Sequence, residues 1–187
     1  MAGRPPFSFY LIDLPSDHEV DDGISTEREV IRAILSNRGF HSVTKTARIS
    51  SSERFQSFGW RPYPGVGYVH LATHGLESGI GLIGGKVNWL EVAKKLKTVA
   101  PPLFASRKRV LTLSCCYSTN GYRKLKPLLK NHFTGCYYFA EDEVRFSDAL
   151  TSWAMFYRKK TIRRPHQAIV SKINDFFDRD VIEFGPI

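Results

Sequence analysis

The stretch YVHLATHG, residues 68–75, is an apolar run that ends in a histidine followed by a glycine. A second apolar run, RVLTLSCCYS at residues 109–118, carries two adjacent cysteines near its end. Short runs of this kind, rich in Val, Leu and aromatic residues, are typical of strands buried on both faces of a parallel sheet. We therefore expect His74 and Cys116 at the ends of two core strands.

Outside these two runs, segments with the residue pattern of a strand alternate along the chain with segments that have the pattern of a helix. Alternation of this kind predicts βαβ units, a mostly parallel central sheet and helices on both of its faces, which is a three-layer α/β/α sandwich. With 187 residues and no visible linker or repeat, residues 1–187 are expected to form a single domain. The further predicted strands are 7–13, 41–47 and 135–141, with a hairpin at 79–85, and the predicted helices are 21–40, 49–58, 88–99, 120–131, 146–160 and 165–180.

Capping residues suggest where two of these helices begin. Ser25 or Thr26 is expected to cap the first helix, because either side chain can accept a hydrogen bond from the first turn. Asn88 is expected to do the same for the helix that follows the hairpin.

Composition narrows the class of protein. No apolar run approaches the roughly 20 residues that span a bilayer, and the N-terminus reads as a first strand rather than a signal peptide. The three cysteines are an odd number with two adjacent, which favours reduced thiols and a cytoplasmic location. No zinc-binding spacing of Cys and His is present, so neither a metal nor another cofactor is expected.

The net charge of +9 is concentrated in one part of the chain. A basic face of this kind can attract nucleic acid or an acidic partner. The alternative is that these charges form only the solvent-exposed surface of two helices. The basic residues, with no acid among them between residues 94 and 130, are Lys94, Lys95, Lys97, Arg107, Lys108, Arg109, Arg123, Lys124, Lys126 and Lys130.

The two strand ends carry groups suited to acyl transfer. Ligands bind beyond the carboxyl ends of parallel strands, and both His74 and Cys116 belong to that edge. A thiol is a nucleophile only as thiolate, and an imidazole can take its proton and later protonate a leaving amine. The backbone N–H groups of Gly75 and Cys116 are the natural donors for an oxyanion.

The order and spacing of three motifs resemble the caspase-like (clan CD) cysteine peptidases, and within them the CHAT family. The motifs are HLATHG, LTLSCCYS and EVRFSDALTSWAMFYRKK, which together span about residues 66–160. The resemblance implies a cysteine endopeptidase with a His74/Cys116 dyad that forms a thioester with a protein or peptide substrate. It also implies a regulated effector of a prokaryotic defence or cell-death system, controlled by a separate regulatory protein.

The family pattern also assigns the neighbouring residues. It aligns Cys115 with an alanine, and strand alternation likewise places the two cysteines on opposite faces, although a register slip of one residue would exchange them. The first substrate pocket is expected to use Ser114 and the loop AEDEVRFSD, residues 140–148. Asp142 is the candidate pocket acid and would favour cleavage after basic residues, unless this loop is simply a solvated acidic turn.

Two other functions remain open on the sequence. One is a catalytically silent CHAT-like module that docks a partner, for instance through its basic face. The other is a nucleic-acid-binding α/β domain, whose binding would weaken steeply with salt.

Overall fold

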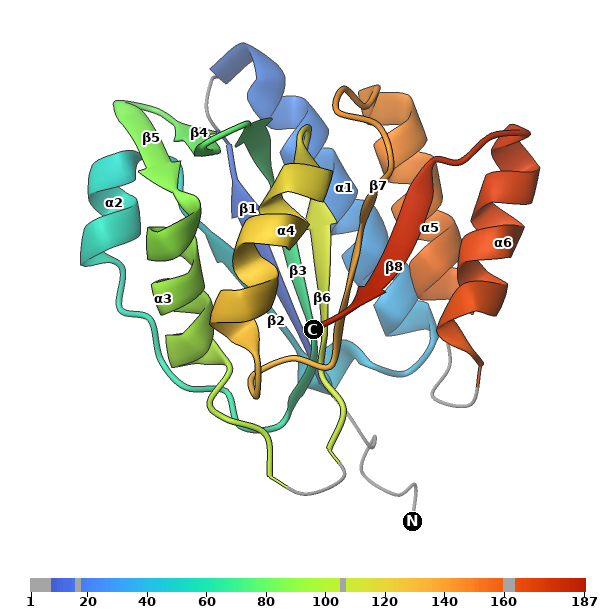
Figure 1. Ribbon diagram of the computed structural model, residues 1–187, viewed down its shortest axis with the longest axis horizontal. Coiled ribbons are helices and arrows are strands. Elements are labelled where there is room, and N and C mark those ends of the chain that lie inside the picture. Colours follow the sequence, from blue (N-terminus) through green and yellow to red (C-terminus); the bar gives the residue numbers. More distant parts are fainter. Residues whose placement is uncertain (1–7, 16–17, 105–106, 160–163) are drawn as a thin grey trace.

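A computed structural model describes residues 8–15, 18–104, 107–159 and 164–187 (Figure 1). Strands and helices alternate along most of the chain, as the sequence predicts. The elements in chain order are β1 (Ser8–Leu14), α1 (His18–Asn37), η1 (His41–Val43), β2 (Thr44–Arg48), α2 (Ser52–Ser57), β3 (Val66–Leu76), β4 (Gly79–Leu82), β5 (Gly85–Asn88), α3 (Trp89–Val99), β6 (Val110–Ser114), α4 (Ser118–Leu129), β7 (Gly135–Phe139), α5 (Phe146–Lys159), α6 (His166–Phe177) and β8 (Ile182–Pro186).

The strands of the described residues form one eight-stranded sheet with the order β2-β1-β3-β6-β7-β8. Neighbours along this path pair in parallel up to β7, and only β8 runs antiparallel to its neighbour. The β4–β5 hairpin extends from the end of β3, where it pairs antiparallel. The predicted α/β class, with a mostly parallel sheet, is therefore confirmed.

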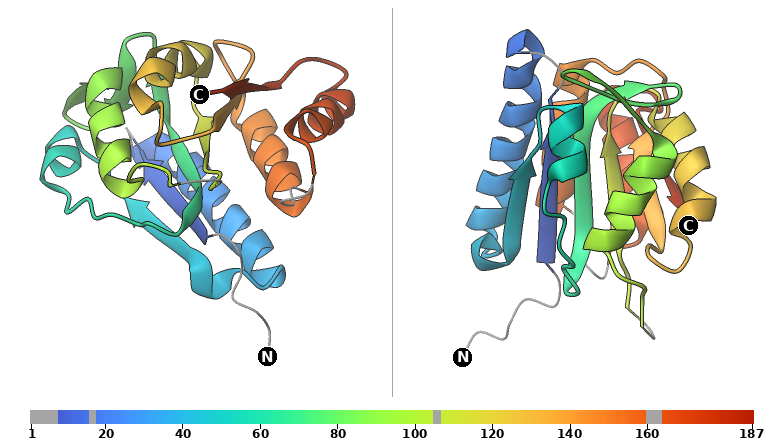
Figure 2. Two further views of the ribbon diagram at one scale, coloured as in Figure 1. Left: turned by 60° about the horizontal axis from the view of Figure 1, so that its bottom comes forward. Right: turned by 90° about the vertical axis from the view of Figure 1, so that its left-hand side faces the viewer.

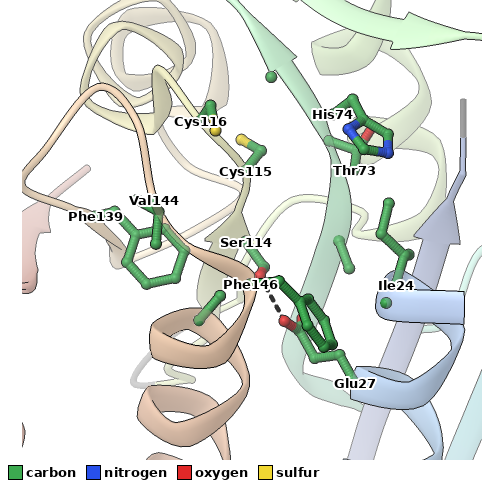
Figure 3. A pocket seen from close by; sticks show the side chains of 14 residues that line it. Ile24, Glu27, Thr73, His74, Ser114, Cys115, Cys116, Phe139, Val144 and Phe146 are labelled. Carbon is green, nitrogen blue, oxygen red and sulfur yellow. Dashed lines mark hydrogen bonds between the residues drawn. The ribbon is translucent and has the colours of Figure 1, made fainter. Parts of the chain in front are cut away.

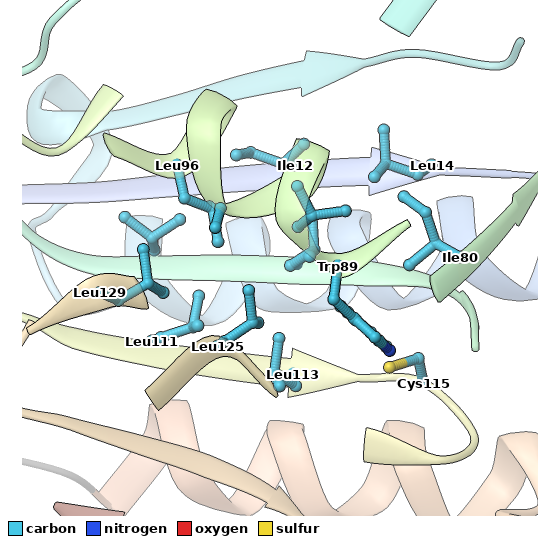
Figure 4. Close-up of a cluster of buried hydrophobic side chains, with 14 of the residues drawn as sticks. Ile12, Leu14, Ile80, Trp89, Leu96, Leu111, Leu113, Cys115, Leu125 and Leu129 are labelled. Carbon is cyan, nitrogen blue, oxygen red and sulfur yellow. The ribbon is translucent and has the colours of Figure 1, made fainter. Parts of the chain in front are cut away.

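Helices cover both faces of the sheet, which gives three layers (Figure 2). Helices α2, α3 and α4 lie on one face and bury one apolar cluster, in which Trp89 packs among leucines of β3, β6 and α4 (Figure 4). Helices α1, α5 and α6 cover a second cluster, rich in aromatic residues such as Trp153 and Phe156. Because side chains alternate along a strand, each central strand contributes to both clusters.

Three predicted features differ from the structure. Residues 41–43, predicted as the start of a strand, form the short 3₁₀ helix η1, and the strand β2 begins at Thr44. Helix α1 begins at His18, so Ser25 and Thr26 lie inside it and neither caps it. The Ser25 hydroxyl instead accepts a hydrogen bond from the Arg48 guanidinium at 2.8 Å, which explains a polar residue within the helix. The third difference is β8, which the sequence pattern did not reveal: it is five residues long, lies at the sheet edge and contains Pro186.

Other local predictions are confirmed. Asn88 caps α3 with a full capping box, in which its side chain accepts from Glu91 N–H and Glu91 reaches back to the Asn88 backbone. The glycine-rich segment forms the β4–β5 hairpin. Among the described residues no helix is both long enough and apolar enough to cross a membrane.

Candidate functional site

His74 and Cys116 meet at the carboxyl ends of two neighbouring parallel strands. The last registered pair between β3 and β6 is Ala72 with Ser114, and each candidate lies two residues beyond it. Both residues line one cavity of about 220 Å³ (Figure 3). The structure therefore brings together the two residues that the sequence singles out, together with Gly75 and Ser114.

Cys116 occupies a tight turn between β6 and α4. The next residue, Tyr117, has the left-handed conformation with φ of 52°, which is uncommon for a residue other than glycine. This turn is fixed from the neighbouring strand, because the Ser118 hydroxyl accepts from Phe139 N–H at 2.8 Å. Tyr117 N–H donates to the backbone carbonyl of Asp142 at 2.6 Å. The thiol thus sits on a strand–turn–helix corner rather than within regular structure.

Gly75 touches the backbone of Cys116 directly. A Cβ atom built on Gly75 would lie 1.6 Å from the Cys116 carbonyl oxygen and 3.0 Å from the Cys116 nitrogen. No side chain fits in that space, so glycine is required here by close approach of two main chains. The histidine strand and the cysteine turn are consequently packed against each other without intervening atoms.

The imidazole and the thiol share the cavity but are not hydrogen-bonded to each other. In Figure 3 the His74 ring lies on one side of the end of β3 and Cys116 on the other, with no interaction drawn between them. His74 and Cys116 are both partly exposed. Catalytic hydrogen bonds often tighten only when substrate binds, so this separation describes the substrate-free arrangement of the pair.

The backbone donor expected at Cys116 is available. Within the described parts of the chain, the N–H of Cys116 makes no hydrogen bond. An unpaired N–H that borders a cavity can accept the negative charge of an oxyanion.

Both adjacent cysteines line the cavity, but they differ in burial. Cys115 is 5% exposed and packs in the cluster beneath α3 and α4, beside Trp89 (Figure 4). Burial raises the pKa of the Cys115 thiol well above its usual range, and the nearby Cys116 and Glu27 add to the rise. A thiol held protonated in this way is a poor nucleophile, which favours Cys116.

Glu27 is the cavity residue that the sequence analysis did not identify. It lies on α1, is 2% exposed and lines the cavity. One carboxylate oxygen accepts from the Ser114 hydroxyl at 2.9 Å, and the other lies 2.7 Å from His70 Nε2. The available signal was its position on the apolar face of the helix, four residues before the buried Ile31.

The predicted pocket acid lies elsewhere. The Asp142 side chain is exposed and is not among the residues that line the cavity, while its carbonyl holds the cysteine turn. Two other acids near it, Glu141 and Asp148, form ion pairs with Arg179. The loop after β7 therefore contributes Val144 and Phe146 to the cavity wall rather than a carboxylate.

One residue of the basic stretch, Arg109, supports the fold and does not face solvent. Arg109 is 2% exposed and donates hydrogen bonds to the carbonyls of Val66, Pro101 and His132, so it is not part of a charged face. Most of the other basic residues between 94 and 130 are exposed, chiefly on α3, on α4 and in the segment before β6. In the described ranges no group of three or more His, Cys, Asp or Glu residues is arranged to hold a metal ion.

No protein-family model matches the chain, and no curated protein matches it significantly in sequence.

Proposed function

We propose that the chain is a cysteine endopeptidase in which Cys116 is the nucleophile and His74 the general base and acid. The observation that carries this proposal is the main-chain contact between Gly75 and Cys116, which places a thiol, an imidazole and a backbone N–H around one cavity. This is the set of groups that acyl transfer requires. The resemblance of the two strand ends to caspase-like peptidases supports the same assignment.

In the acylation step, the Cys116 proton passes to the His74 imidazole and the sulfur attacks the carbonyl carbon of the peptide bond. A C–S bond forms and the carbonyl oxygen becomes an oxyanion, which the N–H groups of Cys116 and Gly75 stabilise. The C–N bond then breaks as His74 returns its proton to the leaving nitrogen. The products are a free amine and a thioester at Cys116.

In the deacylation step, a water molecule attacks the thioester carbon and gives its proton to His74. The C–S bond breaks, the acid product leaves and the sulfur regains a proton. For both steps the His74 ring must turn toward Cys116, which side-chain rotation can provide.

The test measures covalent labelling and peptide cleavage together. Purified protein would be treated with a peptidyl acyloxymethyl ketone, and the labelled residue identified by mass spectrometry. We expect modification of Cys116 in the unaltered protein and in Cys115→Ala, and slow modification after His74→Ala. Labelling of Cys115, or labelling that is independent of His74, would contradict the dyad.

A catalytically silent interaction module is the second candidate, because the imidazole and the thiol are not hydrogen-bonded here. In such a module, His74→Ala and Cys116→Ala would leave partner binding unchanged, and neither peptide cleavage nor probe labelling would occur. In the peptidase, a regulatory protein would instead increase the rate at which Cys116 is labelled.

The proposal places the protein in the cytoplasm. All three cysteines are free thiols, and two of them are buried in the core, where no disulfide holds them. A nucleophilic thiol needs a reducing compartment to stay active.

A further inference from the structure

We propose that Glu27 makes the cavity beside Cys116 select a positively charged side chain, so that the bond cleaved follows lysine or arginine. This inference rests on the proposed peptidase function. It assigns the selection to a buried carboxylate of α1 and not to an exposed acid of the loop after β7.

Most of the cavity wall is apolar. The side chains that face it from α1, β7, α5 and the loop before α5 are Ile24, Phe139, Val144, Phe146 and Ala149. Gly23 allows the Phe146 ring to approach α1, since a Cβ atom there would lie 3.1 Å from that ring. Such walls fit the methylene stem of a long side chain, which lysine and arginine both have.

Among the described side chains that line this apolar cavity, Glu27 is the acidic one. Its two hydrogen-bond partners, Ser114 and His70, each use one carboxylate oxygen. A carboxylate has about four acceptor sites, so both oxygens keep capacity for a further donor. Figure 3 shows Glu27 and Ser114 joined at the cavity. A guanidinium or ammonium group that reached them would form charge-assisted hydrogen bonds.

The bonds around His70 allow Glu27 to keep its negative charge. His70 Nδ1 lies 2.7 Å from the Thr112 hydroxyl, and that hydroxyl lies 3.2 Å from the Tyr157 hydroxyl. If Tyr157 donates to Thr112 and Thr112 to Nδ1, His70 is neutral and donates from Nε2 to Glu27. Each group in the chain then has a partner, and the carboxylate is stabilised by hydrogen bonds alone.

The nearest arginine on the same helix does not neutralise this charge. Arg28 forms its ion pairs with Asp13 at 2.9 Å and with Glu29 at 2.9 Å. His70 lies at ion-pair distance from Glu27, 2.7 Å, and the neutral tautomer described above leaves the carboxylate with neutral partners alone, which is costly in an apolar environment. A substrate cation would offset that cost, so a positively charged side chain should bind in the cavity more tightly than a neutral one.

The position of the pocket fits the residue on the acyl side of the cleaved bond. Ser114, which binds Glu27, is two residues before Cys116, and the same cavity is lined by His74, Gly75 and Cys116. A substrate whose carbonyl carbon meets the Cys116 sulfur can therefore place the side chain of that residue in the cavity.

The test compares two acyloxymethyl ketone probes that differ only in the residue next to the reactive group. One carries arginine and the other citrulline, which has nearly the same shape without the charge. In both, the Cys116 sulfur displaces the carboxylate leaving group, so a C–S bond forms and a C–O bond breaks. We expect the arginine probe to label Cys116 about a hundredfold faster than the citrulline probe.

The variant Glu27→Gln tests the residue itself. Glutamine keeps the shape and can accept from His70 while donating to the Ser114 hydroxyl, so the bonds persist and only the charge is lost. We expect the preference for arginine to fall to about threefold or less. The matched control Asp142→Asn removes the charge of the exposed loop acid and should leave the preference unchanged.

Each outcome decides the inference. Equal labelling by both probes, or an undiminished preference in Glu27→Gln, overturns the role of Glu27 while the peptidase proposal stands. A preference lost in Asp142→Asn and kept in Glu27→Gln assigns selection to the loop instead. If neither probe labels Cys116, the proposed function fails as well. If Glu27→Gln does not fold, equal labelling of the unaltered protein by both probes still overturns the inference, and a preference that is lost in Asp142→Asn still assigns selection to the loop.

Discussion

The two faces of the central sheet differ sharply, although the same two strands supply both. Toward α3 and α4, β3 and β6 present side chains such as Leu71 and Leu113, which pack in an apolar cluster. Toward α1 and α5 they present His70, Thr112 and Ser114, which are hydrogen-bonded and buried. These two strands therefore carry most of their buried polar side chains on one face, while the other face is mainly apolar.

The largest expected effect separates the two adjacent cysteines. Cys116→Ala should reduce peptide cleavage below about one thousandth of the original rate, because it removes the nucleophile. Cys115→Ala, on the packing face, should keep cleavage within about threefold, because the thiol there acts as a small apolar group. Steady-state kinetics on one fluorogenic peptide measures the cleavage rate of both variants. Near-equal losses of rate would contradict the different roles of the two cysteines.

The second effect concerns the contact between β3 and the cysteine turn. Gly75→Ala should lower cleavage about a hundredfold, because the added methyl group overlaps the Cys116 carbonyl and displaces the nucleophile. Gly81→Ala on the adjacent β4 is the matched control, since a Cβ there would make an ordinary 3.8 Å contact with His74. Cleavage and thermal melting should be measured on both variants, and an active Gly75→Ala protein would show that the contact is not needed.

The third effect compares what the two faces contribute to stability. His70→Ala leaves the Glu27 carboxylate with one hydrogen bond fewer and should lower the free energy of unfolding by about 3 kcal/mol. Leu71→Ala, the next residue and on the other face, should cost a similar amount, about 2–5 kcal/mol, by opening a cavity. Urea denaturation measures both, and a negligible loss in His70→Ala would mean that the polar face contributes little to stability.

The smallest effect, taken for one group and one pH unit, is a loss of stability in alkali. Burial raises the pKa of Cys115 and Cys136 on one face, and raises that of Tyr68 on the other to about 12. Groups whose pKa is raised by folding stabilise the protein below their unfolded pKa, and this stabilisation is lost as the pH rises above it. Each should cost about 1.4 kcal/mol per pH unit, starting near pH 8.5 for cysteine and near pH 10 for tyrosine.

Urea denaturation at about pH 8, 9.5 and 11 would assign that loss to a face. Cys115→Ala should reduce the loss in both intervals, whereas Tyr68→Phe should reduce the loss mainly between the last two values. If stability stayed constant over the whole range, the buried thiols and phenols would have to be accessible to hydroxide in the folded protein.

Much of this arrangement follows from the sequence. The apolar runs at residues 68–75 and 109–118 predict two central strands, and parallel pairing then forces His74 and Cys116 to the same edge. Alternation along the second run predicts the burial of Cys115. These predictions succeed because they depend only on the period of a strand and on the direction of its neighbours.

Other features depend on contacts that no local pattern encodes. The polar residue Glu27 belongs to the site because α1 packs beside β3, where the carboxylate reaches His70 of β3 and Ser114 of β6. The edge strand β8 depends on its pairing with β7. The local pattern of a five-residue segment does not show whether such pairing occurs. Residue type alone did not reveal that the predicted pocket acid, Asp142, is exposed and is not among the residues that line the cavity.

The hydrogen bond from Tyr117 N–H to the Asp142 carbonyl has an evolutionary consequence. It joins the turn of the nucleophile to a distant loop through main-chain atoms only. Substitutions at position 142 can therefore accumulate without loosening the turn, whereas a deletion in that loop would pull the carbonyl away. Related sequences should conserve the length of this loop more strictly than its composition.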